Sequence, residues 1–224
     1  VRSRVTANSL TELISKSGDV YIMGHRVADM DAVGAALGVN CLCRKLGKKA
    51  WIVLDLENNA SEKLIEEIQS VPEYDGMLIS GQDALLRCDR NSILIVVDTN
   101  RPDQVECRSL LEAISKVSVI DHHRRAADYI SPVVVNFHEP YASSASELVT
   151  ELLQYAVETG DVMPIEAKSL LAGIFLDTKS FNVRTGERTF EAAAFLRQLG
   201  ADTVEVKKLL QNDFQDTISK YQII

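Results

Sequence analysis

The sequence of 224 residues lacks any apolar run close to the roughly 20 residues that a membrane-spanning helix needs. Residues 1–10 are polar and basic, so they lack the apolar core of a secretory signal peptide. Internal repeats and low-complexity linkers are also absent. Hydrophobic residues at 46% and charged residues at 25% are typical of a soluble globular chain, and the length fits one large or two small domains.

Basic residues are fewer than acidic residues in this sequence. The chain has 24 Lys and Arg residues against 32 Asp and Glu residues, which gives a net charge of −8. This balance argues against a broad electrostatic grip on duplex nucleic acid, which needs a basic surface. It remains compatible with a small phosphate ligand, because a bound metal ion can supply the positive charge. We therefore expect no duplex nucleic acid among the partners.

Cysteine lacks the spacing of a zinc motif. No pair is separated as Cys-x-x-Cys, and no nearby histidine completes a zinc pattern. We expect four reduced and mostly structural thiols, as in a cytoplasmic protein. They are Cys41, Cys43, Cys88 and Cys107.

Short apolar runs alternate with helical patterns through the first part of the chain. Residues 93–97, Ile-Leu-Ile-Val-Val, are apolar on both faces, as is typical of a central parallel strand. The alternation predicts an α/β fold, with a mainly parallel β-sheet flanked by helices and a helical C-terminal side. Further strands are expected at 20–23, 50–54, 77–79, 117–120 and 133–135. Helices are expected at 1–16, 31–46, 61–70 and 102–115, after the capping box 144–147, and at 164–176, 189–199, 204–210 and 215–224.

Acidic and imidazole side chains follow three of the expected strands. If these strands are parallel neighbours, their side chains project from one edge of the sheet, where α/β proteins bind ligands. An acid that ends an apolar helix can join them. The set comprises His25, Asp29, Asp31, Asp98, Asp121, His122, His123 and Asp177. The chain has four histidines, and we interpret the remaining one, His138, as a loop residue.

This grouping of charges predicts a metal site. Several carboxylates in one cleft raise each other's pKa by like-charge repulsion, and divalent cations remove that cost. Carboxylates mixed with imidazoles suit Mn²⁺, and less specifically Mg²⁺, Co²⁺ and Fe²⁺. Four acids and two imidazoles are enough for two ions that share a carboxylate. Two ions about 3.5–4 Å apart form a clamp for in-line attack on phosphorus.

Simpler interpretations exist for each residue alone. An Asp after a strand is commonly a cap or turn residue, and residues 98–100, Asp-Thr-Asn, fit an Asx turn. His25 fits a hydrogen-bonded loop histidine, and residues 121–123 fit a surface turn. These readings do not account for so many acids and histidines that all follow apolar runs. The combined pattern favours the metal site.

The same residues form four motifs that resemble those of the DHH phosphoesterase family. The motifs are Gly-His-x-x-x-Asp-x-Asp at 24–31, Val-Asp at 97–98, Asp-His-His at 121–123 and Gly-Ile-Phe-Leu-Asp-Thr at 173–178. They span nearly the whole chain in the family's order. Finer stretches at 96–102, 139–147 and 176–185 resemble the cyclic di-AMP phosphodiesterases of that family. One departure is Ala28, where the family often has Pro, which affects loop stiffness and not the ligands.

The resemblance implies a role for each site residue. His25 and Asp29 would bind one ion, and Asp98 would bridge both ions. Asp31, His122 and Asp177 would bind the second ion. Asp121 would orient an imidazole, and His123 would contact the substrate phosphate as a general acid or transition-state donor. We therefore expect Asp121 and His123 to be catalytic residues.

The resemblance also implies an activity. It is the hydrolysis of cyclic di-AMP to linear pApA by a metal-dependent phosphodiesterase with two divalent ions, Mn²⁺ in the first place. A nano-RNase or pApA hydrolase uses the same core, and a family II pyrophosphatase fits the finer stretches less well. A non-catalytic nucleotide-sensing module would require broken ligands, and none is broken. The expected partner is a cyclic dinucleotide.

The resemblance finally implies a larger protein. We expect residues 1–210 to form the catalytic domain and residues 211–224 to begin a linker helix towards a C-terminal substrate-binding domain. The glycine-rich motif of that domain, Gly-Gly-Gly-His, is not in this sequence. The first residue, Val1, also suggests a fragment. In the full-length protein we expect membrane anchoring, a cytoplasmic location for this fragment without membrane contact of its own, and a homodimer.

Overall fold

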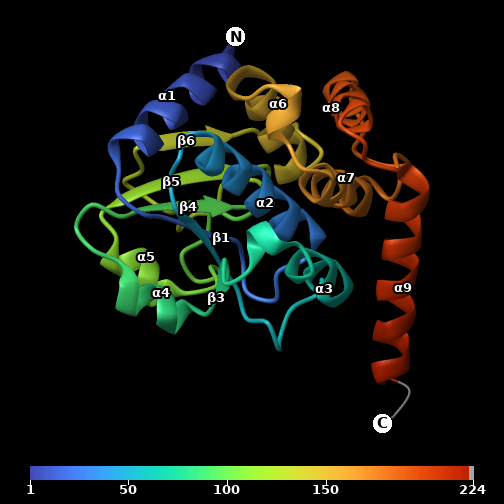
Figure 1. Ribbon diagram of the computed structural model, residues 1–224, viewed down its shortest axis with the longest axis horizontal. Helices are drawn as coiled ribbons and strands as arrows, with labels where there is room; N and C mark the ends of the chain where they lie inside the picture. The colour runs from blue at the N-terminus through green and yellow to red at the C-terminus, as the bar shows by residue number, and fades with distance from the viewer. Residues whose placement is uncertain (222–224) are drawn as a thin grey trace.

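A single parallel sheet organises the chain. The computed structural model describes the backbone of residues 1–221 and the side chains of residues 1–213 and 215. Six strands pair in the order β3-β2-β1-β4-β5-β6, all parallel (Figure 1). Their bounds are Val20–Met23 for β1, Ala50–Val53 for β2, Leu78–Ile79 for β3, Ile93–Val97 for β4, Lys116–Asp121 for β5 and Val135–His138 for β6. The predicted parallel α/β sheet is confirmed.

Helices cover both faces of this sheet. They are α1 (Arg2–Lys16), α2 (Met30–Lys45), α3 (Glu62–Gln69), α4 (Gly81–Arg87), α5 (Arg108–Ala113), α6 (Ala145–Ala156), α7 (Pro164–Thr178), α8 (Glu187–Gln198) and α9 (Thr203–Tyr221). Two short 3₁₀ helices lie at Pro72–Tyr74 and Thr159–Asp161. Helices α4 and α5 lie side by side on one face, while α1, α2, α6 and α7 cover the other (Figure 1). No helix among residues 1–221 combines the length and the apolar character needed to cross a membrane.

The strands are apolar on both faces because each face has its own core. In β1, Val20 and Ile22 pack with α1, α2 and α7, whereas Tyr21 and Met23 pack with α4 and α5. All four side chains are fully buried. Alternating side chains point to opposite faces of a strand, so an uninterrupted apolar run is what a sheet covered on both sides requires.

Glycines let the helices of the larger core pack closely. A Cβ at Gly34 of α2 would lie 2.3 Å from the carbonyl oxygen of Ser169 in α7. A Cβ at Gly173 of α7 would lie 2.2 Å from Oγ of Ser146 in α6. Because of these contacts α7 packs directly against α2, and the last turn of α7 ends at the edge of the sheet.

Three predicted elements differ from the structure. The helix expected at 102–115 is only α5, because residues 101–105 form a turn in which Val105 pairs with His25. The helices expected at 204–210 and 215–224 are one helix, α9, as far as residue 221; residues 222–224 lie outside the described part. The edge strand begins at Val135 and ends at His138, so His138 is a strand residue and the loop interpretation is wrong.

Candidate metal centre

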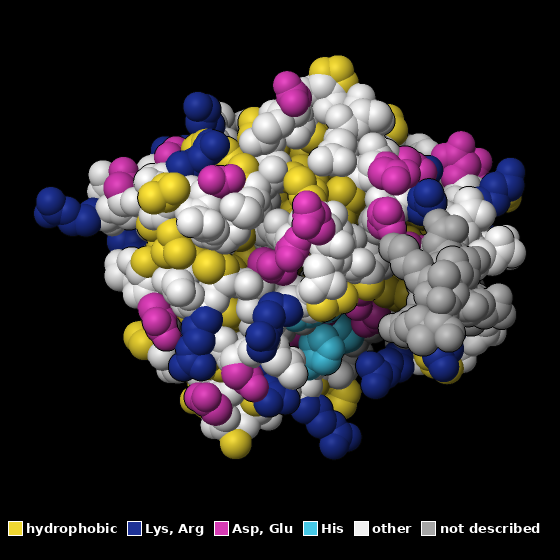
Figure 2. Space-filling view, turned by 90° about the horizontal axis from the view of Figure 1, so that it is seen from below, with side chains coloured by type: hydrophobic (Ala, Val, Ile, Leu, Met, Phe, Trp, Pro, Cys, Tyr) yellow, Lys and Arg dark blue, Asp and Glu magenta, His cyan; other side chains and the backbone are white. Residues whose placement is uncertain are grey.

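The predicted residues meet at the carboxyl edge of three adjacent strands. His25 follows β1, Asp98 follows β4, and His122 and His123 follow β5, whose last residue is Asp121. Asp29 and Asp31 start α2, and Asp177 comes from the last turn of α7. Figure 2 shows histidine side chains reaching the surface as one patch with Lys and Arg side chains beside it.

A first group of possible ligands combines His25, Asp29 and Asp98. Their ligand atoms all lie within 4.8 Å of one another. Nε2 of His25 is 3.6 Å from Oδ1 of Asp29 and 3.4 Å from Oδ2 of Asp98. Nδ1 of His25 lies 2.8 Å from the carbonyl oxygen of Arg26, to which it donates its proton. When the ring is neutral, this bond places the lone pair on Nε2, the nitrogen that faces the two carboxylates.

A second group combines Asp31, His122 and Asp177. Nε2 of His122 lies 3.1 Å from Oδ2 of Asp177 and 3.6 Å from Oδ2 of Asp31. The same nitrogen is 3.2 Å from Oδ1 of Asp98. Asp98 therefore faces both groups, one oxygen towards each. Its backbone has a φ of 59°, a left-handed conformation that Asp tolerates better than most residues.

Two buried atoms of this cluster are left without hydrogen-bond partners. Within the described part of the chain, Oδ1 of Asp98 and Nε2 of His122 have none, although only 3.2 Å separates them. Buried polar atoms are normally satisfied, and each exception calls for an explanation. A lone pair on an imidazole nitrogen and one on a carboxylate oxygen that face the same space suit a shared cation. The residues present therefore fit a divalent metal ion.

The electrostatics of the cluster show the cost of leaving it without positive charge. Burial raises the pKa of Asp31 well above its ordinary value, and the charges of Asp98 and Asp177 raise it further. Burial lowers the pKa of His25, but the carboxylates of Asp29 and Asp98 outweigh burial and raise it to about 11. Burial opposes the ionisation of Asp98, but His122 and His25 outweigh it and lower its pKa to about 2. Protonated imidazoles thus supply the positive charge that a cation otherwise brings.

The Asp31 carboxylate is fixed by the start of α6. Its two oxygens accept hydrogen bonds from the backbone N–H groups of Ala145 and Ser146, each at 2.8 Å. The N-terminus of a helix favours an anion, so these bonds orient the carboxylate and favour its charged form. The capping box at 144–147 was visible in the sequence, but this role was not, because the contact joins residues more than 100 positions apart.

His123 differs from His122 in its surroundings. Its side chain is 52% exposed, whereas that of His122 is buried. Nδ1 of His123 lies 2.7 Å from Oδ1 of the fully buried Asp121, which raises the pKa of His123. The expectation that Asp121 holds an imidazole thus corresponds to a contact with His123. Asp121 is absent from the ligand groups, whereas His123 belongs to a third group, with Asp98 and His122, whose ligand atoms also lie within 4.8 Å of one another. Nδ1 of His123 is 3.7 Å from Oδ1 of Asp98.

One histidine that the motifs passed over also reaches this loop. Nε2 of His138 donates to the carbonyl oxygen of His123 at 2.5 Å. The pairing of β5 with β6, in which Asp121 is opposite His138, places it there. Its sequence neighbours, Asn-Phe-His-Glu-Pro, gave no signal for this contact.

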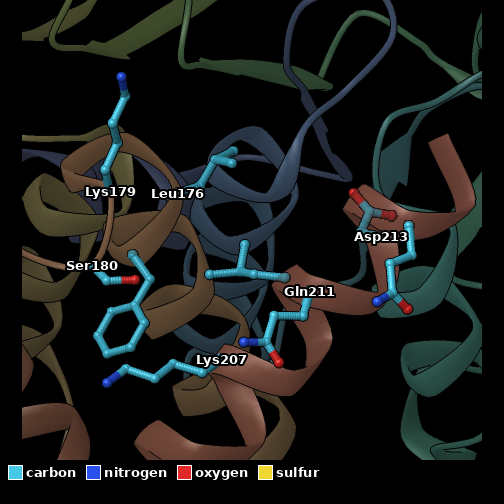
Figure 3. A pocket seen from close by; sticks show the side chains of 9 residues that line it. Leu176, Lys179, Ser180, Lys207, Gln211 and Asp213 are labelled. Carbon is cyan, nitrogen blue, oxygen red and sulfur yellow. The ribbon is translucent and has the colours of Figure 1, made fainter. Parts of the chain in front are cut away.

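A cavity of about 740 Å³ lies elsewhere, between the end of α7 and α9. Figure 3 shows its labelled side chains, among which Lys179 extends away from the others. It is lined by Phe175, Leu176, Lys179, Ser180, Lys207, Leu210, Gln211, Asp213 and Gln215. None of the clustered acids and histidines lines it, so this cavity is formed by other residues than the candidate metal centre.

Known proteins match both the sequence and the fold. The cyclic-di-AMP phosphodiesterase GdpP of Geobacillus thermodenitrificans (strain NG80-2) is 43% identical over 226 residues, covering 100% of this chain and 34% of the relative. The cyclic-di-AMP phosphodiesterase PdeA of Listeria monocytogenes serotype 1/2a (strain 10403S) is 40% identical over 226 residues, with the same coverage of 100% and 34%. The chain thus spans about a third of the length of these relatives.

A solved structure supports the fold. The exopolyphosphatase-related protein of Bacteroides fragilis superposes with a TM-score of 0.74 at 17% identity, covering 93% of this chain and 60% of that one. The model of the DHH family, N-terminal domain, matches residues 19–174, from just before β1 into α7. The matched region holds every clustered ligand except Asp177, which follows it by three residues. With this match and whole-chain identities of 40% and more, the chain belongs to the DHH family.

Proposed function

We propose that this chain is the catalytic part of a metal-dependent phosphodiesterase that hydrolyses cyclic di-AMP to linear pApA. The observation that carries the proposal is the pair of ligand groups around Asp98, with unsatisfied buried atoms on Asp98 and His122. The substrate follows from similarity, because two relatives that match the whole chain are named cyclic-di-AMP phosphodiesterases. Since the chain spans a third of those relatives, the activity of the whole protein is part of the proposal.

Two divalent ions, preferably Mn²⁺, are the proposed cofactors. His25 and Asp29 would hold one, and Asp31, His122 and Asp177 the other, with Asp98 shared. Mixed carboxylate and imidazole ligands suit Mn²⁺ better than they suit Mg²⁺ or Ca²⁺, which prefer oxygen alone. When bound, such ions offset the charge of phosphate oxygens and lower the pKa of water.

His123 and Asp121 have the arrangement of a proton-donating pair. Asp121 accepts the hydrogen bond from Nδ1–H of His123, which leaves Nε2 of the half-exposed ring for the substrate. Formation of pApA adds the oxygen of a water molecule to phosphorus and breaks the bond between phosphorus and the ribose 3′ oxygen. The leaving oxygen gains a proton, for which Nε2–H of His123 is the proposed donor, and the proton lost by the water molecule passes to solvent, from which His123 is protonated again.

An assay on three substrates tests this function. The 224-residue chain and the full product of its gene are incubated with Mn²⁺ and cyclic di-AMP, pApA or pyrophosphate, with the Asp98→Ala variant as the control for contaminating activity. We expect cyclic di-AMP to be converted to pApA. Preferential cleavage of pApA would instead identify a nano-RNase or pApA hydrolase. Binding of the nucleotides without turnover of any substrate by either protein would identify a sensing module.

The wider organisation is proposed on the same similarity. We assign residues 1–210 to the catalytic domain and 211–224 to the start of the linker helix, although α9 is continuous across residue 211. In the full-length protein this part would be a cytoplasmic domain of a membrane-anchored homodimer. Size measurement by light scattering and fractionation of cells that express the full gene product would test both points.

A further inference from the structure

Asn100 occupies a buried position next to the proposed proton-donating pair. It is two residues beyond Asp98, and 6% of its surface is exposed. Its side-chain nitrogen donates to Oδ2 of Asp121 at 2.5 Å and to the carbonyl oxygen of Arg124 at 3.2 Å. Its side-chain oxygen accepts from the backbone N–H of Ala126 at 3.0 Å. Both hydrogens of the amide, and one acceptor site, are thus in use.

The partners of Asn100 lie on both sides of His123 in the sequence. Asp121 accepts from Asn100 through one oxygen and from His123 through the other. Arg124 and Ala126 belong to the segment that follows His123 and lies outside the helices and strands. The backbone carbonyl of Asn100 also accepts from N–H of Ile130, a buried residue of the smaller core. Asn100 therefore holds both Asp121, which is the hydrogen-bond partner of His123, and the backbone segment that follows His123.

We propose that Asn100 is a positioning residue, whose side chain holds Asp121 and the segment after His123 so that the His123 ring stays aimed at the substrate. The inference rests on the proposed function for its effect on turnover. An amide suits this position because one face donates and the other accepts. A carboxylate would meet Asp121 with a like charge, and a hydroxyl would not reach three partners.

Two variants separate the contacts. Asn100→Ala removes all three. Asn100→Asp keeps an acceptor for Ala126 and replaces the donor that faces Asp121. Asn40→Ala is the matched control, because Asn40 is a buried asparagine in α2 whose side-chain nitrogen donates to the carbonyl oxygen of Ala50 at 3.1 Å. This control shows how the loss of a buried structural amide away from His123 affects turnover and metal content.

Turnover and metal content are measured together in the 224-residue chain. We expect kcat on cyclic di-AMP to fall about 100-fold in both Asn100 variants, the scale of a misplaced catalytic group, with KM little changed. The Mn²⁺ content of both variants should equal that of the wild-type chain. Asn40→Ala should keep the wild-type kcat. Wild-type turnover in Asn100→Ala, or loss of metal from it, would overturn the inference.

A spectroscopic readout keeps the inference independent of the substrate. The chain has four histidines, so ¹⁵N-labelled histidine gives few signals in the metal-free protein. We expect the Nδ1–H signal of His123 to weaken in both variants, while that of His25, bonded to Arg26, is unchanged. Hydrogen exchange of the Ala126 amide should speed up in Asn100→Ala and not in Asn100→Asp.

These signals decide the matter if the wild-type chain does not cleave cyclic di-AMP. In that case the proposed function fails, and the positioning role is tested only by the Nδ1–H signal of His123 and the hydrogen exchange of the Ala126 amide. An unchanged His123 signal in both variants would refute it.

Discussion

Nε2 of His122 and Oδ1 of Asp98 face each other at 3.2 Å inside the protein, and neither has a hydrogen-bond partner among the described residues. Two acceptor lone pairs at that separation repel each other unless a proton or a cation lies between them. In the metal-free chain a proton on His122 supplies positive charge beside these carboxylates, because Asp177 and Asp98 raise the pKa of His122 against the effect of burial. Metal ions and protons therefore compete for the same atoms.

Replacement of Asp98 should affect both ions. We expect Asp98→Ala to lose two-ion binding, because both ligand groups include or face this carboxylate. Asp29→Ala should weaken mainly one ion. Elemental analysis after Mn²⁺ loading gives the stoichiometry, about two ions for the wild type. Asp98→Asn tolerates the left-handed backbone better than Ala and so separates strain from ligand loss. Two ions bound to Asp98→Ala at wild-type affinity would contradict the shared role.

The two adjacent histidines should behave differently. His122→Ala should lower metal affinity and activity together, because the buried His122 faces three carboxylates. His123→Ala should keep the metal content and lower kcat by about 100- to 10,000-fold, the range of general acid–base catalysis. Metal titration and turnover on the same samples provide the comparison. Loss of metal from His123→Ala alone would show that the roles are reversed.

The stability of the metal-free chain should fall as pH rises. The folded-state pKa of His25, about 11, is above the ordinary value of 6.5, so the folded state binds more protons between these values. Its contribution is full below pH 6.5 and is lost as the pH rises towards 11. The raised pKa values of His122 and Asp31 act in the same direction. Urea unfolding in EDTA should show a loss on the order of 1–3 kcal/mol between pH 6.5 and 8.5.

Bound metal should reverse this slope. Its ligands are deprotonated when they bind, so metal affinity and the stability that it contributes grow with pH. The same unfolding series with excess Mn²⁺ under anaerobic conditions provides the control. Parallel slopes with and without Mn²⁺ would show that the titrating groups are not the ligands.

Gly173→Ala should disturb the centre although it replaces none of the proposed ligands. The added Cβ would lie 2.2 Å from Oγ of Ser146 and 2.8 Å from Oδ1 of Asp31. Such overpacking costs about 1–3 kcal/mol, and we also expect weaker Mn²⁺ binding, since Asp31 must shift. The control is Gly186→Ala, where no atom beyond the neighbouring residues in the chain lies within 4 Å of the added Cβ. Thermal unfolding and Mn²⁺ titration measure the two effects, and wild-type affinity in Gly173→Ala would oppose this view of Asp31.

The sheet was predictable because its strands are short apolar runs covered on both faces. Residues 93–97 form β4 at the sheet centre as expected. The helix α4 was missed because its seven residues are too few to show a periodic pattern. The helix expected to begin at residue 102 does not, because residues 101–105 turn back instead to pair with the first motif. Local sequence does not encode such a pairing.

The convergence of acids and histidines was predictable for a similar reason. Parallel neighbours end at one edge, so residues after β1, β4 and β5 must meet there. The contacts that orient them were not predictable. Asp31 meets the start of α6, and Asp121 meets Asn100, through tertiary packing that no spacing reveals. His138 was passed over because only the register of β5 and β6 brings it to His123.

The position of Asp177 in α7 sets an order on the assembly of the centre during translation. His25, Asp29 and Asp98 leave the ribosome with the first half of the chain, and the strands that His25 and Asp98 follow, β1 and β4, are neighbours in the folded sheet. The second group lacks one carboxylate until α7 has emerged and packed against α2 and α6. We therefore expect a nascent chain to offer the first ligand group early and the second only after the helical half has been made.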